Sequence, residues 1–252
     1  MDWNALKLVD MAAALKGHEG AGSARQNQML EFPYHMGTKG VHEIAPAEYG
    51  DGPAALGFAL TSAVAPEDGA CLWVREDRLE RDRGQPCADG LRTLGIDPGR
   101  LMVITARKTA DALWAIEEAM KSHAAGLVLA EISGLDFTAS RRLALASETH
   151  GAAAVLVLPH TLEGASAATT RWRVSALPSA PNSLAPEQLG ALRWQAVLER
   201  ARNAPFAIGR SHGLEFNHET LSLDLVPGLA AGQTPPPQTD TPADILTFAR
   251  TG

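Results

Sequence analysis

The chain has 252 residues, of which 45% are hydrophobic and 20% are charged. This composition excludes a disordered acidic protein and a coiled coil, and the length is enough for one domain with a sizeable core. The formal net charge of -7 excludes a basic nucleic-acid footprint over the whole molecule but leaves room for a local basic patch. The apolar stretches fall far short of the roughly 20 residues that span a bilayer, and the N-terminus lacks a secretory signal. We therefore expect a cytoplasmic protein without membrane contact.

The first 26 residues are predicted to form a helical appendage followed by a linker. Trp3, Leu6, Val9 and Ala13 recur at helical spacing, and small and polar residues follow this pattern. We expect residues 1–26 to serve either self-association of the chain or packing on its core.

Between the two ends, residues 27–230 are predicted to form one domain. Short, uniformly apolar strands alternate with helices, which is typical of a parallel sheet covered on both faces. The predicted strands are 40–44, 70–75, 101–105, 127–132 and 152–158, and the predicted helices are 54–65, 91–94, 109–120 and 138–149. Four strand-like segments then follow with no helix between them: 171–177, 192–200, 205–210 and 220–226. We expect these four to extend the sheet as antiparallel strands, which gives an α/β fold class.

The last 22 residues, 231–252, are rich in proline, threonine and glutamine, which predicts a flexible tail. Inside this tail, Thr241 and Pro242 are typical of a helix N-terminus, and apolar residues follow them. One interpretation is a short helix that folds on a protein partner, and the other, which we favour, is a frayed chain end. The first interpretation makes partner-binding candidates of three side chains: Ile245, Leu246 and Phe248.

The loop after the first predicted strand, residues 45–54, lies where an α/β protein binds phosphate, because free backbone N–H groups converge at the start of the next helix. A loop of the G-x-x-x-x-G-K-[ST] type supplies a lysine for the phosphates and a hydroxyl for Mg²⁺. This loop lacks the lysine, since none occurs between Lys39 and Lys108. Asp51 and Glu48 instead add negative charge, and one like-charge pair about 4 Å apart costs on the order of 4 kcal/mol at an effective dielectric constant of about 20. We therefore predict a vestigial nucleotide site around Gly50, Asp51 and Gly52.

Two strand ends extend this vestigial site. Glu131 stands where nucleotide-hydrolysing α/β proteins hold Mg²⁺, and Glu76 and Asp77 stand where such proteins keep a water-activating carboxylate. One hypothesis is a residual ATPase that uses these acids with an arginine in place of the missing lysine. The alternative, which we favour, is that the acids cap helices and stay solvated. The run 75–83, with four arginines and four acids, is likewise predicted to be a solvated face.

No other group of residues predicts catalysis or metal binding. His42-Glu43 lacks the second histidine of an H-E-x-x-H motif, and no G-x-S-x-G sequence occurs. The two cysteines, Cys71 and Cys87, have no histidines at ligand spacing. His212 and His218 are interpreted as surface residues that flank a hairpin turn. We expect no catalytic residue, no metal and no cofactor.

Arg171-Trp172-Arg173 is the best indication of nucleic-acid binding. On a strand the two arginines share one face, and Trp172 points to the other. Basic residues beside an aromatic ring bind a single strand through phosphate contacts and stacking. The same alternation also describes a strand whose tryptophan lies in the core, and we favour this interpretation. With two arginines at the start of a predicted helix, the DNA-binding candidates are Arg141, Arg142, Arg171 and Arg173.

The ordered segments of the predicted domain resemble the ImuA family, RecA-like proteins encoded with ImuB and an error-prone replicative-type polymerase in bacterial mutagenesis cassettes. The similarity covers about residues 35 to 226. Its most specific segments are Thr-Ala-Ser-Arg-Arg-Leu at 138–143 and Thr-Arg-Trp-Arg-Val at 170–174. The others are 40–44, the lysine-less loop with 54–60, 72–75, 111–119 and 135–137.

The resemblance implies a RecA-like fold and a DNA-damage-induced accessory role in translesion synthesis. Such a protein acts through an ImuB-like polymerase-related protein, the error-prone DNA polymerase or RecA, and its contact with DNA is mainly indirect. RecA holds DNA with loops after its fourth and fifth strands, whereas the corresponding segment here, 159–170, contains Glu163 and no lysine or arginine. The sequence thus predicts a partner-binding protein, with a residual ATPase and a single-strand DNA-binding module as alternatives.

Overall fold

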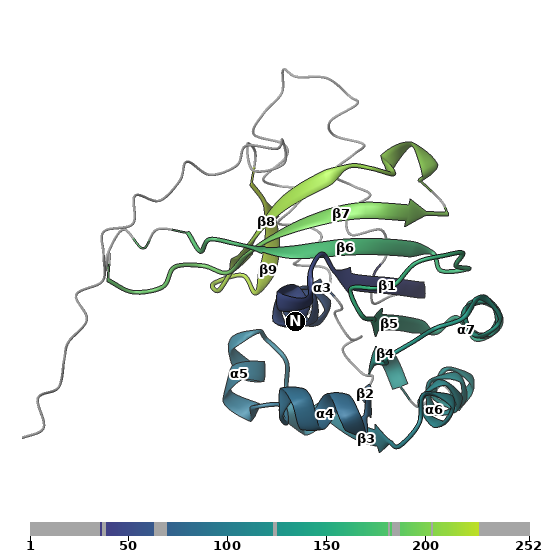
Figure 1. The fold of residues 1–252 in the computed structure, drawn as a ribbon. Helices are drawn as coiled ribbons and strands as arrows, with labels where there is room; N and C mark the ends of the chain where they lie inside the picture. Colours follow the sequence, from purple (N-terminus) through teal and green to yellow (C-terminus); the bar gives the residue numbers. More distant parts are fainter. Residues whose placement is uncertain are drawn as a thin grey trace, which may run out of the picture.

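The computed structural model describes residues 36, 39–62, 70–122, 125–180, 182, 187–202 and 204–226 (Figure 1). The predicted appendage, residues 1–26, and the predicted tail, residues 231–252, lie outside the described residues. The same is true of the partner-binding candidates Ile245, Leu246 and Phe248. No helix in the described ranges is long and apolar enough to cross a membrane.

The described residues form one nine-stranded sheet. Its strands are β1 (Gly40–Pro46), β2 (Ala70–Glu76), β3 (Leu101–Ala106), β4 (Ala125–Glu131), β5 (Ala153–Val157), β6 (Thr170–Leu177), β7 (Arg193–Ala201), β8 (Ser211–Asn217) and β9 (Ser222–Leu225). Across the sheet they follow the order β3-β2-β4-β5-β1-β6-β7-β8-β9. Neighbours from β3 to β6 are parallel, and β7, β8 and β9 are added antiparallel. This arrangement confirms the predicted fold class, a mostly parallel sheet extended by antiparallel C-terminal strands.

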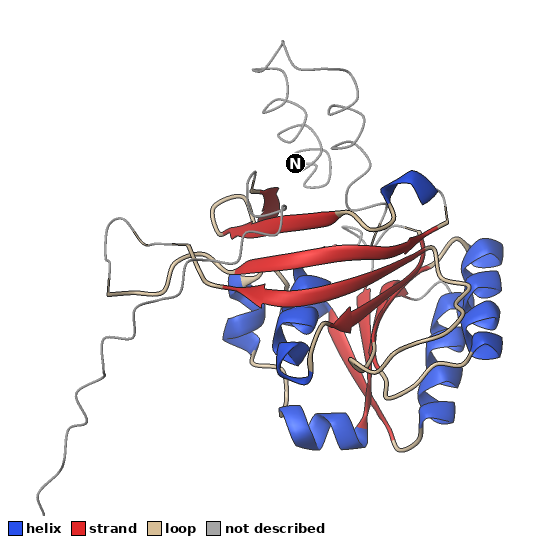
Figure 2. Ribbon diagram, turned by 45° about the horizontal axis from the view of Figure 1, so that its top comes forward, coloured by secondary structure: helices blue, strands red, loops and turns tan. Residues whose placement is uncertain are grey.

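Helices lie on both sides of the sheet (Figure 2). The helices are α3 (Gly52–Ser62), α4 (Asp77–Arg83), α5 (Ala88–Thr93), α6 (Thr109–Ser122) and α7 (Phe137–His150), with short 3-10 turns η1 (Tyr49–Asp51), η2 (Pro98–Arg100) and η3 (Pro205–Ala207). Because successive side chains of a strand point to opposite faces, β1 contributes to two cores. Ile44 joins the core beneath α3, and Val41 and Ala45 join the core beneath α6 and α7.

The strand β6 differs from the prediction on one side, because it runs parallel to β1, although it is antiparallel to β7 as expected. The connection from β5, residues 158–169, crosses back to the amino end of the sheet without forming a helix. Thr169 donates its backbone N–H to Val41 O at 2.7 Å, which places the end of this crossover beside β1. The absence of a helix before β6 therefore does not indicate an antiparallel strand, since a crossover of about a dozen residues is enough to join parallel strands.

The predicted strand 205–210 is also wrong. Pro205 begins the 3-10 turn η3, and Gly209, at φ +84°, donates its N–H to Leu198 O at 2.8 Å. The strand β8 starts only at Ser211, in a stretch between the predicted strands 205–210 and 220–226. As a result His212 lies within β8 instead of flanking the hairpin turn, and its ring meets Trp172 edge-on at 5.9 Å.

Gly57 of α3 lets the helix approach β7 closely. A Cβ at this position would lie 3.3 Å from Cζ2 of Trp194, a contact that requires a small shift, and longer side chains would enter the ring itself. We expect Gly57→Leu to lower the free energy of unfolding by about 1–3 kcal/mol, as overpacking does, in urea titrations followed by circular dichroism. The matched control is Gly90→Leu in the exposed helix α5, where the nearest side-chain atom to a new Cβ is 3.8 Å away. Equal stability of the two variants would contradict the close packing.

His212 makes the stability of the fold depend on pH. Burial lowers the pKa of His212 below 6.5, and the charge of Arg210 lowers it further. Between that lowered pKa and 6.5 the unfolded chain binds more protons than the folded chain, so the free energy of unfolding falls as the pH falls through this window. We expect His212→Phe, which keeps a ring against Trp172, to show a shallower loss between pH 7.5 and 5.5 in urea titrations. An unchanged slope would contradict this assignment.

Candidate functional site at the carboxyl ends of the strands

In the loop after β1, a carboxylate of the loop itself occupies backbone N–H groups at the place where a phosphate would be bound. Asp51 accepts hydrogen bonds from the backbone N–H of Glu48 at 3.2 Å and from that of Ala176, on β6, at 3.0 Å. The Glu48 side chain accepts reciprocally from the backbone N–H of Asp51. Pro53, the second residue of α3, has no N–H to offer. The predicted site residues Gly50, Asp51 and Gly52 therefore form a closed capping arrangement at the start of the helix.

Glu131, at the end of β4, is fully buried and bound by two arginines. Its carboxylate accepts from Arg75 Nε at 2.6 Å and from Arg83 Nη1 at 2.6 Å, so each oxygen has a cation. Arg75 is also buried and donates a further hydrogen bond to Gly84 O at 2.8 Å. A Cβ on Gly52 would lie 3.7 Å from Arg83 Nη2. The ion-paired cluster thus reaches from the end of β4 to the first residue of α3.

The acid at the end of β2 is bound as well. Glu76 accepts from the backbone N–H of Ser133 at 2.8 Å and from its hydroxyl at 2.7 Å. Asp77 begins α4 and pairs with Arg81 at 2.9 Å in an exposed i,i+4 bridge. The expectation that the strand-end acids stay solvated is therefore wrong for Glu76 and Glu131, and holds only for Asp77. Glu76 and Glu131 are buried at the ends of their strands. Each of these two carboxylates therefore requires hydrogen-bond donors.

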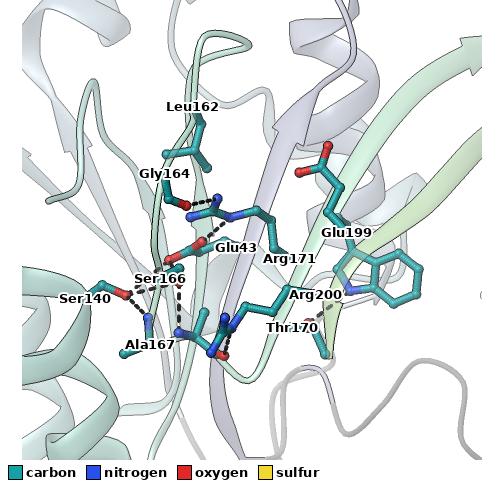
Figure 3. Close-up of polar contacts among 12 residues, drawn as sticks. Glu43, Ser140, Leu162, Gly164, Ser166, Ala167, Thr170, Arg171, Glu199 and Arg200 are labelled. Carbon is teal, nitrogen blue, oxygen red and sulfur yellow. Dashed lines mark hydrogen bonds and ion pairs between the residues drawn. The ribbon is translucent and has the colours of Figure 1, made fainter. Parts of the chain in front are cut away.

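A second buried network lies on the face of β1 that α7 covers (Figure 3). Glu43 is fully buried and accepts from Arg171 Nε at 2.7 Å, from Ser166 Oγ at 2.6 Å and from Ser140 Oγ at 3.3 Å. Ser140 belongs to the segment 138–143 and Arg171 to the segment 170–174. The two most specific segments of the sequence thus meet at one carboxylate.

The crossover from β5 to β6 is held by guanidinium groups that bind its backbone. Four arginines donate hydrogen bonds to carbonyl oxygens of this segment. The contacts are Arg171 with Gly164 at 3.0 Å, Arg173 with His160 at 2.8 Å and Leu162 at 3.1 Å, Arg200 with Ala168 at 3.1 Å, and Arg202 with Ala167 at 2.7 Å. The segment therefore has a fixed course over the sheet.

Comparison with known proteins identifies the family. No protein-family model matches the sequence. Over 181 residues, 65% of this chain and 70% of the relative, the chain is 33% identical to Protein ImuA of two strains of Caulobacter vibrioides. The chain belongs to the ImuA family. Among solved structures, SulA from Pseudomonas aeruginosa matches at 18% identity, with a TM-score of 0.37 over 47% of this chain and 97% of SulA. Such a score is too low to support an argument.

In this ImuA-family chain the predicted DNA-binding arginines occupy different settings. Arg171 is 8% exposed in its pair with Glu43, and Arg173 binds Glu199 through two bonds, at 2.7 and 3.1 Å. Arg142 pairs with Glu117 of α6, and Arg141 lies exposed on α7. DNA binding by these residues stays a prediction. Trp172 is fully buried, which confirms its predicted place in the core.

Sequence reasoning missed several members of the candidate site. Arg75 and Arg83 were assigned to a solvated run, whereas the first is buried and both bind Glu131. Glu43 was considered only as part of an incomplete metal motif. The available signal was an acid in the middle of a strand predicted to be buried in the sheet, because such a charge must find a cation. The described residues contain no group of three or more histidine, cysteine, aspartate or glutamate side chains able to hold a metal ion.

The Glu131 cluster is expected to be structural. Glu131→Gln would leave the buried Arg75 guanidinium without its counter-charge, and removal of one partner of a buried pair costs about 3–5 kcal/mol. Asp77→Asn is the control, because it removes one partner of the exposed Arg81 pair and should cost less than about 1 kcal/mol. Urea titrations measure both losses. If the Glu131 variant were as stable as the control variant, the buried pair would not hold this edge together.

Proposed function

We propose that this ImuA-family chain is a non-catalytic accessory protein of error-prone translesion synthesis, induced by DNA damage and acting in the bacterial cytoplasm. Its partners would be an ImuB-like polymerase-related protein, the error-prone DNA polymerase and RecA. The observation that carries the proposal is the self-contained chemistry of the carboxyl edge. Glu76 and Glu131, the strand-end acids that would serve Mg-ATP, are already bound within the chain, and Asp51 closes the turn before α3.

The cost of using this edge for ATP supports the proposal. Mg²⁺ would have to displace Arg75 or Arg83 from Glu131, and a displaced Arg75 would remain buried without its anion. A phosphate would have to displace the Asp51 carboxylate from the N–H groups of Glu48 and Ala176. No lysine stands in this loop to compensate either loss.

An indirect relation to DNA is supported by the same reasoning. Arg171 and Arg173 hold the crossover segment and bind Glu43 and Glu199, so a phosphate would compete with existing ion pairs. A role through protein partners does not require this exchange.

One observation favours a residual ATPase as the second candidate. Arg83 reaches the first residue of α3, where the missing lysine of a functional loop would act, and its side chain is 30% exposed. In this alternative Arg83 would bind phosphate while Glu131 is held by Arg75.

Calorimetric titration with Mg-ATP, with and without single-stranded DNA, separates the two candidates. We expect no binding heat at high protein concentration in either titration. Micromolar binding that is lost in Arg83→Gln would favour the ATPase.

The accessory role has its own test. The purified chain should form a stable complex with the ImuB-like protein of its own cassette in size-exclusion chromatography. Absence of that complex, and of complexes with the polymerase and RecA, would contradict the accessory role.

A further inference from the structure

The edge strand β3 carries no charge, proline or bulge within its length. Among the described residues it pairs only with β2, at one end of the sheet (Figure 1). Its sequence, Leu-Met-Val-Ile-Thr-Ala, contains no charge and no proline. Natural edge strands are commonly blunted by lysine, proline or a bulge, because a bare edge pairs with other chains. This strand is therefore suited to accept an additional strand.

Exposed apolar side chains stand on both faces of this edge. Met102 is 61% exposed and Val103 is 41% exposed, and as neighbours on a strand they point to opposite faces. Ile104, by contrast, packs against the core beneath α6. An added strand would cover both exposed side chains with its own alternating side chains while it bonds to the backbone groups of β3 that face away from β2.

Basic residues stand at both ends of β3. Arg100 precedes the strand and Arg107 and Lys108 follow it, and all three are exposed. Among the described residues, two carboxylates lie near this edge: Glu80 accepts from the Thr105 hydroxyl at 2.6 Å, and Asp97 accepts from the N–H of Gly99 at 2.9 Å. The strand thus combines an apolar centre with positively charged ends.

This charge pattern argues against a symmetric pair formed by the β3 strands of two copies of the chain. In a two-fold antiparallel pair of β3 strands, Arg100 of each copy would face Arg107 of the other, and like charges directly opposite each other destabilise paired strands. A segment with acidic residues at its ends would instead place a carboxylate beside each basic end.

We propose that β3 is a docking edge for an extended segment of a protein partner, apolar in its centre and acidic at both ends. The segment adds to β3 as a tenth strand of the sheet. This inference rests on the proposed function, because it assigns the surface through which an accessory protein would meet its partner.

A pair of synthetic peptides tests the edge independently of any partner. Both are seven-residue, fluorescein-labelled peptides with alternating valine and threonine in the centre; one has glutamate and the other lysine at each end. We expect the full chain to bind the acidic peptide at least tenfold more tightly in fluorescence anisotropy. The charge-reversed variant Arg100→Glu, Arg107→Glu should invert this preference. The control Lys39→Glu, Arg141→Glu changes the net charge equally at two exposed positions outside β3 and should keep the original preference.

Equal binding of the two peptides, or a preference that survives reversal at Arg100 and Arg107, would overturn the proposal. A second variant, Met102→Asn with Val103→Asn, should weaken the acidic peptide at least tenfold, whereas Leu145→Asn on the exposed face of α7 should not. The side chains of Met102, Val103 and Leu145 are all exposed, and circular dichroism checks that each variant is folded.

The ImuB-like protein then separates this inference from the proposed function. If wild type binds it and the Met102, Val103 variant does not, both stand. If the variant binds it as well as wild type, β3 is not the docking edge, although the accessory role survives. If wild type binds the acidic peptide but none of the three expected partners, the edge stands and the proposed function fails.

Discussion

The carboxylate of Glu43 is the constraint on which the arrangement around the central strand depends. It sits on a strand with sheet neighbours on both sides and helices over both faces, where an isolated charge would be prohibitively costly. Arg171 supplies the counter-charge, and Ser166 and Ser140 supply further donors. One acid therefore joins β1, β6, α7 and the crossover segment, and the loss of either charged partner would leave the other buried alone.

The same constraint, a carboxylate held by donors of the chain itself, applies at the carboxyl edge. Where an α/β protein of this architecture would offer open donors and acids to a nucleotide, this chain bonds those groups to one another. Arg75 and Arg83 hold Glu131, Ser133 holds Glu76, and Asp51 closes the turn into α3. The edge has internal ion pairs and hydrogen bonds at the positions where binding groups would be needed. This is the physical basis for regarding the fold as a scaffold for protein contacts.

Much of the fold could be predicted from local patterns, because apolar strands and capped helices have short-range signals. The stretch from β1 to β5 was predicted on this basis, and so was the burial of Trp172. The direction of β6 could not be predicted, since it depends on long-range contacts such as that of Thr169 with Val41. The candidate site, too, combines features that have a local signal with features that depend on long-range contacts. The missing lysine is visible in the sequence, but the partners of Glu131 are 56 and 48 residues away from it along the chain. Pairing over such distances leaves no local pattern.

The arginine contacts of the crossover segment have a consequence for how this protein can change over evolution. Four guanidinium groups recognise the segment through carbonyl oxygens, which every amino acid possesses. Outward-facing residues of the segment can therefore be exchanged without altering its path, whereas a change in one of the four arginines would release part of it. At these outward-facing positions the amino acid can change without a change in the path of the backbone, so new surface chemistry can arise there.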